Sequence, residues 1–477
     1  MSFLVLGIDL GTTSVKVAVI DSENQQVLDV QSENTNADIV SDTSPLGSEQ
    51  CHLKILEACT TCIQRLKDEH RKHIGRIAVS GQMHGVILWS SHLITAHQID
   101  DCLDLSSYQD DNISPLYTWQ DARCSEDFLT TLPQPDSHLN LATGHGCATL
   151  IWIKKNIPSF FGSNTNVRFD CAGTIMDMLT AILCGLVKPV MSVQNAASWG
   201  FYNTVTNSWN KQILQNTGFP INLLPNVIQP ARKVGELKAS WLGIPKGAGV
   251  GVAMGDLQCS ILPHLISDTH AVVNVGTSMQ AVFKCPSDFK PTRCSLPQAL
   301  EYFPFFNGSY LTVAASLNGG NVLAATVKMF QQMMEAMQVP QEYFTDEKVI
   351  TILMEKGKNV TKTDLKINPT IFGERHAMKK KGDVRNITPF NMNIGDLSRA
   401  LCSGLMENLV DMLPREILCT AGITRIVGCG NALLKNEILQ EELKRVYDLP
   451  VEMATDDVNA AVGSAIALAI FWHTSEK

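Results

Sequence analysis

The stretch FLVLGIDLGTTSVKVAVID, residues 3–21, constrains the fold more than any other part of the chain. Residues 3–8 are almost all apolar, which is typical of a strand buried on both faces, and residues 15–20 predict a second strand. The turn between them leads into a strand and lacks the GxxxxGK[ST] pattern of a Walker phosphate loop. The stretch therefore predicts a β-hairpin with a tight turn at residues 11–14.

This turn has the features of an anion site. Gly11 lets the backbone approach a ligand closely, the N–H groups of the turn form a concave donor surface, and Lys16 adds positive charge. The hydroxyl groups add further donors, from Thr12, Thr13 and Ser14. Asp9 lies at the end of a buried strand, where a carboxylate is costly unless it is paired, hydrogen-bonded or facing a cation. A Mg²⁺ ion carried by a nucleotide would satisfy this carboxylate. The alternative is an ordinary hairpin in which Asp9 caps its own turn.

Residues 271–283, AVVNVGTSMQAVF, repeat the strand, Gly-Thr-Ser turn and strand, with Asn274 in the place of Asp9. We interpret this as an internal repeat of two domains, 1–252 and 253–477, each presenting a turn to a shared cleft. Gly276 and Thr277 would then face the first turn, and two such turns can hold a polyphosphate from both sides. A fortuitous Gly-Thr-Ser turn is the alternative.

Gln82, Met83 and His84 follow a short apolar run at residues 77–79. They are expected at the mouth of a strand, where open α/β sheets place their ligands. A histidine with satisfied hydrogen bonds and a purely structural role is the alternative for His84.

The segment YTWQDAR, residues 117–123, predicts an extended strand with Trp119, Asp121 and Arg123 on one face. An indole beside a carboxylate and a guanidinium suits a polyhydroxylated ligand, because it offers an apolar plate with charged acceptors and donors. The alternative is a surface Asp/Arg pair beside a packed tryptophan.

Two further turns carry candidate residues. The segment GVGVAMGD places Asp256 where a buried strand meets a helix, either as an N-cap or as an ionised general base for a sugar hydroxyl. Gly430 and Asn431 lie in a strand-to-helix turn, Cys-Gly-Asn-Ala, that a flat ring could approach closely. The Ala-rich helix predicted at residues 456–470 is expected to pack against that turn.

Composition excludes several classes of protein. The net charge of −9 argues against a nucleic-acid partner or an anionic membrane surface. The longest apolar runs, such as residues 461–472, are shorter than the roughly 20 residues of a membrane span, and no signal peptide is predicted. The 14 cysteines are expected to be reduced core residues, including the lone CxxC at 59–62, so a cytoplasmic location is predicted.

In this order, the motifs GIDLGTTSVK, GQMHG, WxDxR, GD, NVGTS, GER and GCGN resemble the FGGY family of carbohydrate kinases over nearly the whole chain. The resemblance implies an α/β architecture, the duplicated actin-like (ribonuclease H-like) ATPase fold, with two lobes around a central cleft. It implies an ATP-dependent kinase that acts on the terminal hydroxyl of a ketose. Within the family, the chain is most similar to enzymes of the seven-carbon ketose sedoheptulose, and a five-carbon ketose such as xylulose is the alternative.

The resemblance also implies roles for individual residues. Asp256 would be the general base, and Asp9 and Asp256 would face Mg²⁺. The ATP contacts would be Asp9, Gly11, Thr12, Thr13, Ser14, Lys16, Gly276, Thr277, Gly430 and Asn431. The sugar contacts would be Gln82, Met83, His84, Trp119, Asp121 and Arg123. A monomer or homodimer is expected, and a non-catalytic, nucleotide-gated protein of the same fold is the alternative from another class.

Overall fold

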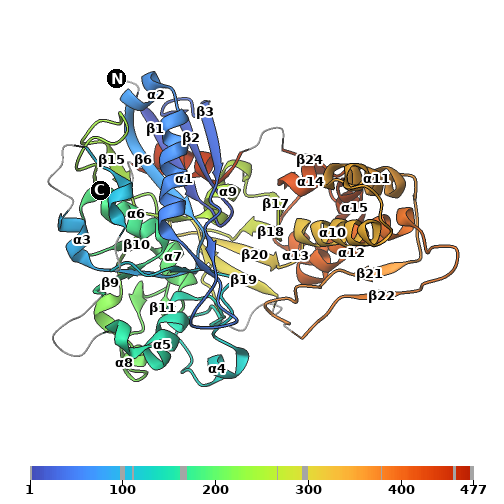
Figure 1. Cartoon of the computed structure of the whole chain (residues 1–477), viewed down its shortest axis with the longest axis horizontal. Helices are drawn as coiled ribbons and strands as arrows, with labels where there is room; N and C mark the ends of the chain where they lie inside the picture. Colours follow the sequence, from blue (N-terminus) through green and yellow to red (C-terminus); the bar gives the residue numbers. More distant parts are fainter. Residues whose placement is uncertain are drawn as a thin grey trace.

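The computed structural model describes residues 3–96, 102–109, 112–161, 169–265, 267–292, 299–377, 379–454 and 458–472. Figure 1 shows two groups of elements side by side, with blue and green elements on the left and orange ones on the right. Each group is built on its own sheet of strands.

The chain forms two main sheets. The first has the order β14 (Lys233–Glu236), β15 (Gly249–Gly251), β6 (Ile74–Gly81), β1 (Leu4–Leu10), β2 (Ser14–Asp21) and β3 (Val27–Asn34), and β16 (Met254–Gly255) also pairs with β6. The second has the order β19 (Leu300–Pro304), β20 (Tyr310–Ser316), β18 (Met279–Lys284), β17 (His270–Val275), β23 (Arg425–Cys429) and β24 (Val451–Met453).

Short strands pair outside these sheets: β4 (Asp38–Ile39), β5 (Glu49–Gln50) and β8 (Leu116–Tyr117) together, β7 (Ile87–Trp89) with β9 (Cys171–Gly173), β10 (Val190–Ser192) with β13 (Asn226–Ile228), β11 (Tyr202–Asn203) with β12 (Ser208–Trp209), and β21 (Lys366–Asn368) with β22 (Asp383–Arg385). The helices are α1 (His52–Arg65), α2 (Asp68–Lys72), α3 (Ser91–Ala96), α4 (Glu126–Thr130), α5 (Gly146–Asn156), α6 (Ile175–Cys184), α7 (Val193–Ser198), α8 (Lys211–Gln215), α9 (Asp256–Ile261), α10 (Gly320–Ala336), α11 (Asp346–Lys358), α12 (Ile394–Met412), α13 (Arg415–Thr420), α14 (Asn431–Leu434), α15 (Glu437–Tyr447) and α16 (Ala460–Phe471).

The internal repeat is confirmed by strand pairing. β1 pairs antiparallel with β2 and parallel with β6, and β17 pairs antiparallel with β18 and parallel with β23. Asp9 lies opposite Lys16 in the first hairpin, and Asn274 lies opposite Gln280 in the second. The two hairpins predicted from sequence therefore occupy equivalent places in the two sheets.

Helix α16 packs differently from the prediction. Its main contacts are with β1, β6, β2 and α9, so the end of the chain returns to the first sheet, where Figure 1 shows a red helix among blue strands. Small residues explain this close approach, because a Cβ on Gly7 would collide with the backbone of Ala461, and one on Gly463 with the backbone of Cys259. The buried face of α16 forms one core cluster with residues of both sheets.

The CxxC pair lies on the buried face of α1, the helix expected in this region. Both Cys59 and Cys62 are completely buried, and burial raises the pKa of both thiols, that of Cys62 to about 11. A protonated thiol is a poor metal ligand and nucleophile, so this pair is part of the core. Within the described ranges, no helix combines the length and apolar character that a bilayer crossing requires.

Candidate functional site

Two carboxylates lie at the same end of the first sheet, next to strands that both pair with β6. Asp9 is level with Ser80 of β6, and Gly255, which precedes Asp256, is level with Gly81 of β6. The Oδ1 atom of Asp9 is buried and has no hydrogen-bond partner in the described structure, while Oδ1 of Asp256 accepts a hydrogen bond from the backbone N–H of Leu257 at 2.8 Å. The register of β6 thus places both acids at the same end of the first sheet, on the two sides of β6.

Burial perturbs both groups. It raises the pKa of Asp9 to about 6, against the opposing effect of Lys16. It raises the pKa of Asp256 to about 7, and repulsion from Asp9 adds to that rise. An unsatisfied carboxylate beside a second one fits a cation, because a positive charge would relieve both costs. Among the described residues, no three His, Cys, Asp or Glu side chains are arranged to hold a metal ion by themselves. A magnesium ion held here would therefore take its other ligands from phosphates and water.

The first turn is held firmly from outside the hairpin. The carbonyl oxygen of Thr12 accepts hydrogen bonds from Gln50 Nε2 and from Thr35 Oγ1, both at 2.9 Å. The Thr12 hydroxyl accepts a hydrogen bond from Trp119 Nε1 at 3.0 Å. Thr13, at the tip of the turn, has an exposed side chain. The turn therefore has a fixed backbone, and it touches one of the predicted sugar residues.

Three turns of the second half meet around Gly276. Its carbonyl oxygen accepts a hydrogen bond from the N–H of Gly320 at 2.8 Å, at the start of α10, and Thr277 accepts one from Asn321 at 3.0 Å. Gly430 has φ +89°, and a Cβ on it would collide with Asn274 Oδ1 and the carbonyl oxygen of Val275. Glycine is thus required at the third turn by both conformation and space.

The structure brings the predicted Gly276, Thr277, Gly430 and Asn431 together. It adds Gly319–Gly320, for which we predicted no role. A Gly-Gly pair directly before an apolar helix was the available signal for this turn. The side chains of Thr277 and Asn431 are exposed at this meeting point, so they are accessible to a ligand.

His84 has the unusual backbone φ of +72° and a half-buried side chain. Its Nδ1 lies 3.0 Å from the carbonyl oxygen of Ser198, which can only accept, so Nδ1 carries the proton and Nε2 is an acceptor. Its ring stacks on His145 with centroids 5.0 Å apart and lies edge-on to Phe303 of β19. Burial lowers the pKa of His84 to about 3, with a further contribution from the positive charge of Arg375, so this side chain is neutral at pH 7.

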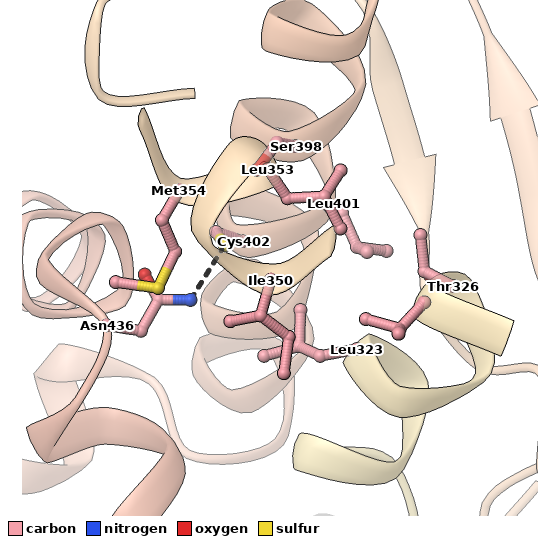
Figure 2. Close-up of a pocket in the computed structure, with 10 residues that line it drawn as sticks. Leu323, Thr326, Ile350, Leu353, Met354, Ser398, Leu401, Cys402 and Asn436 are labelled. Carbon is pink, nitrogen blue, oxygen red and sulfur yellow. Dashed lines mark hydrogen bonds between the residues drawn. The ribbon is translucent and has the colours of Figure 1, made fainter. Parts of the chain in front are cut away.

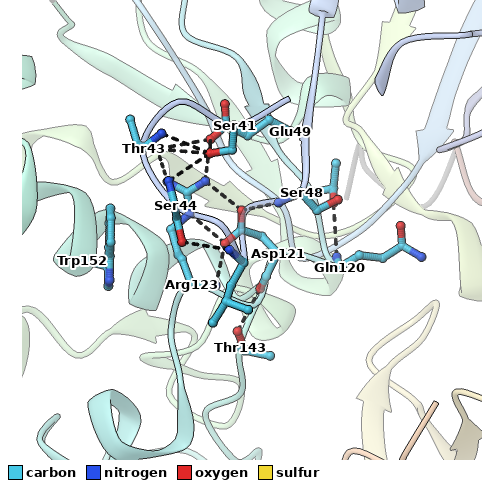
Figure 3. Close-up of polar contacts among 12 residues, drawn as sticks. Ser41, Thr43, Ser44, Ser48, Glu49, Gln120, Asp121, Arg123, Thr143 and Trp152 are labelled. Atoms are coloured by element: carbon cyan, nitrogen blue, oxygen red, sulfur yellow. Dashed lines mark hydrogen bonds and ion pairs between the residues drawn. The ribbon is translucent and has the colours of Figure 1, made fainter. Parts of the chain in front are cut away.

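The predicted strand at residues 117–123 is wrong, because β8 ends at Tyr117 and a turn follows. Asp121 is fully buried and Arg123 has no exposed side-chain surface. Arg123 binds both oxygens of Asp121 at 2.7 and 2.9 Å, and Glu49 Oε1 at 2.6 Å (Figure 3). Its guanidinium also lies between the rings of Tyr117 and Trp152.

This buried group corrects the prediction for two of the three residues. Asp121 accepts a further hydrogen bond from the N–H of Ser48 at 2.9 Å, so the charged atoms of Asp121 and Arg123 are used within the protein. With no exposed side-chain surface, neither can touch a sugar in this arrangement of the chain. They hold the turn that carries Trp119. The side chain of Trp119 is half-buried, and its contact with a ligand stays a prediction.

Gln82 and Met83 differ in their surroundings. Gln82 Nε2 donates to Gln50 Oε1 at 3.0 Å, and its own Oε1 is buried without a partner among the described residues. Met83 is 4% exposed, and a Cβ on Gly255 would collide with its thioether. Gln82 thus retains an unsatisfied acceptor, whereas Met83 mainly supports the residue preceding Asp256.

A separate small cavity of about 40 Å³ lies between α10, α11, α12 and the start of α15. Figure 2 shows Leu323, Ile350, Leu353, Met354 and Leu401 around it, with Asn436 donating to Cys402 at its edge. This volume holds no more than a few water molecules, so it is a packing defect rather than a substrate site.

Comparison with known proteins agrees with this geometry. The profile described as "FGGY family of carbohydrate kinases, N-terminal domain" matches residues 4–262. The sedoheptulokinase of Homo sapiens is 41% identical over 99% of this chain and 98% of that protein, and the one of Mus musculus is 41% identical over 97% and 96%. The crystal structure of a gluconate kinase from Lactobacillus acidophilus superposes with a TM-score of 0.76 at 18% identity, covering 98% of this chain and 89% of that one. The predicted two-lobe, actin-like fold is confirmed.

Proposed function

The chain belongs to the FGGY family of carbohydrate kinases, and we propose that it transfers the γ-phosphoryl group of ATP to the terminal hydroxyl of sedoheptulose. The observation that carries this proposal is the pair of desolvated carboxylates, Asp9 and Asp256, near the first Gly-Thr turn, to which Trp119 is hydrogen-bonded. The similarity to sedoheptulokinases over almost the full chain supports the seven-carbon ketose.

Asp256 is the proposed general base. A pKa near 7 leaves a useful fraction of the group ionised at neutral pH while keeping it basic enough to accept the proton of a sugar hydroxyl. Its backbone is fixed at the β16–α9 junction, and Gln194 Oε1 accepts a hydrogen bond from the N–H of Gly255 at 3.1 Å. The base therefore sits on a rigid element, as proton transfer in a defined geometry requires.

The remaining residues divide into two groups by their position. The phosphates would lie between the first turn (Gly11 to Ser14, with Lys16) and the second turn (Gly276, Thr277), with the adenosine at Gly430 and Asn431. A bound Mg²⁺ would supply charge neutralisation of the phosphates, and Asp9 and Asp256 are the residues that would hold it. Trp119, His84 and Gln82 would bind the sugar, the indole covering its apolar face and the polar atoms meeting its hydroxyls.

Asp256→Asn tests the assignment of the base. We expect turnover to fall by about 10² or more, while the Kd for ATP stays within a factor of three, because the amide keeps the shape but cannot accept the proton. The assay couples ADP release to a panel of sedoheptulose, xylulose, ribulose and glycerol. A variant with near-normal turnover contradicts the role of Asp256, and a wild-type preference for xylulose replaces the seven-carbon substrate with the five-carbon one.

A further inference from the structure

Arg375 belongs to the second half of the chain and reaches the sugar-type residues of the first half. Its guanidinium lies over the ring of Trp119, 5.8 Å from the ring centroid. Within the described structure its side chain has neither a hydrogen bond nor an ion pair. The residue is half-buried, and desolvation lowers its pKa. The donors of this guanidinium are therefore available to a ligand that lies beside the indole.

The residue before it is fixed by an unusual number of contacts. Glu374 is fully buried, and its carboxylate accepts hydrogen bonds from Ser316, Asn318 and Asn408 at 2.6 to 2.9 Å. It also accepts one from the N–H of Leu317 at 3.1 Å. A four-donor clamp on a buried carboxylate holds the backbone of the loop still, so the direction of Arg375 is set by the fold.

The charges around Arg375 identify the part of the site that it faces. Glu301 of β19 attracts it, and its positive charge lowers the pKa of both His84 and His145. Neither Asp9 nor Asp256 shows an interaction with it in the described structure. Arg375 therefore belongs with the histidine pair and Trp119, away from the two carboxylates where phosphoryl transfer is proposed.

We propose that Arg375 is a sugar-binding residue, whose guanidinium donates hydrogen bonds to the hydroxyl groups of the ketose at the end remote from Asp256. This rests on the proposed function. A fixed, planar guanidinium can donate to two adjacent hydroxyl oxygens. Glu301 is the nearby acceptor, and its side chain also lacks a hydrogen-bond partner in the described structure. The second half of the chain thereby contributes to sugar recognition as well as to nucleotide binding.

The test is Arg375→Met, which keeps the length of the side chain and removes its donors. Arg385→Met is the matched control, because Arg385 is exposed on β22 and pairs with Asp383. We expect the KM for the preferred ketose to rise about 10- to 100-fold in Arg375→Met, the loss of a charge-assisted hydrogen bond, while the KM for ATP stays within about two-fold. The control variant should match the wild type in both.

A direct binding measurement distinguishes a residue that contacts the ketose from one that only stabilises the fold. The preferred ketose should raise the melting temperature of the wild type and of Arg385→Met, and this ketose-induced shift should be lost in Arg375→Met even where its ligand-free melting temperature is unchanged. Arg375→Lys, which keeps the charge without the fork, serves as the second variant, with an intermediate KM expected.

The outcomes are distinguishable. An unchanged ketose KM in both Arg375 variants, or equal rises in the KM for ketose and ATP, overturns the role of Arg375 and leaves the proposed function standing. A wild-type protein that phosphorylates no ketose overturns both.

Discussion

Asp256→Asn should stabilise the protein more at pH 8 than at pH 5. The carboxyl group has a pKa of about 7 in the folded protein against an ordinary value of 3.8, so the folded state binds its proton more tightly than the unfolded chain does. The ionised group therefore destabilises the fold progressively as pH rises from about 4 to about 7, and the full cost is present above pH 7. Asparagine carries no charge and escapes this cost at every pH.

The magnitude follows from the size of the shift. At about 1.4 kcal/mol per pKa unit, the cost at pH 8 is at most about 4 kcal/mol, and at pH 5 about 1.7 kcal/mol. Because Asp256 is only half-buried, we halve these limits for solvent screening, which leaves a difference of about 1 kcal/mol between the two pH values. Unfolding entropy for 477 residues is about 1 kcal/mol per kelvin, so the gain in melting temperature should be about 1 °C larger at pH 8.

The assay is thermal unfolding of nucleotide-free wild type, Asp256→Asn and the control Asp411→Asn, which changes an exposed acid on α12. Asp411→Asn should show no such dependence on pH. An Asp256→Asn variant whose change in melting temperature is the same at pH 5 and pH 8, or one that is destabilised at pH 8, would refute the reasoning. The first result would mean that the carboxylate is not desolvated, and the second that its charge is satisfied within the protein.

Two further substitutions probe other parts of the site. Arg123→Met should lower the free energy of unfolding by about 3–5 kcal/mol, because Glu49 and Asp121 lose their shared partner in the interior. A loss below about 1 kcal/mol, measured by denaturant unfolding, would contradict the buried ion-pair group of Glu49, Asp121 and Arg123. Gly430→Ala should raise the KM for ATP at least ten-fold and leave ketose binding unchanged. The control is Gly422→Ala, at a similar φ of +78° but with open space around it, which should leave both constants unchanged. Equal effects of the two substitutions would show that backbone strain alone is responsible.

The sequence predicted best what depends on local pattern. Alternation and apolar runs identified both hairpins, and the repeated Gly-Thr-Ser turn revealed the duplication that strand pairing confirms. The position of Asp256 at a strand-to-helix junction was also readable, because a Gly-Asp pair after a buried strand has few other interpretations. These features need only neighbouring residues to form.

Features that depend on distant partners were missed. Asp121 and Arg123 were predicted to meet a ligand because their two-residue spacing suits a strand, but Glu49, over 70 residues earlier, pairs with Arg123 and draws the turn into the interior. Helix α16 was assigned to the wrong neighbour for the same kind of reason, since Gly7 at the other end of the chain makes room for it. No local spacing in the sequence carries this information.

In both halves of the chain, a residue proposed to bind the sugar is linked to a turn proposed to bind the nucleotide. In the first half, Trp119 donates a hydrogen bond to Thr12 of the first turn. In the second half, Asn318 donates a hydrogen bond to the carboxylate of Glu374, the residue before Arg375. Asn318 directly precedes the Gly319–Gly320 turn, and the N–H of Gly320 donates to Gly276. In the proposed mechanism, a displacement of either turn would therefore move a group that binds the sugar. Because in-line transfer depends on sub-ångström alignment of the two substrates, these links give a physical reason for sugar and nucleotide to be aligned together rather than independently.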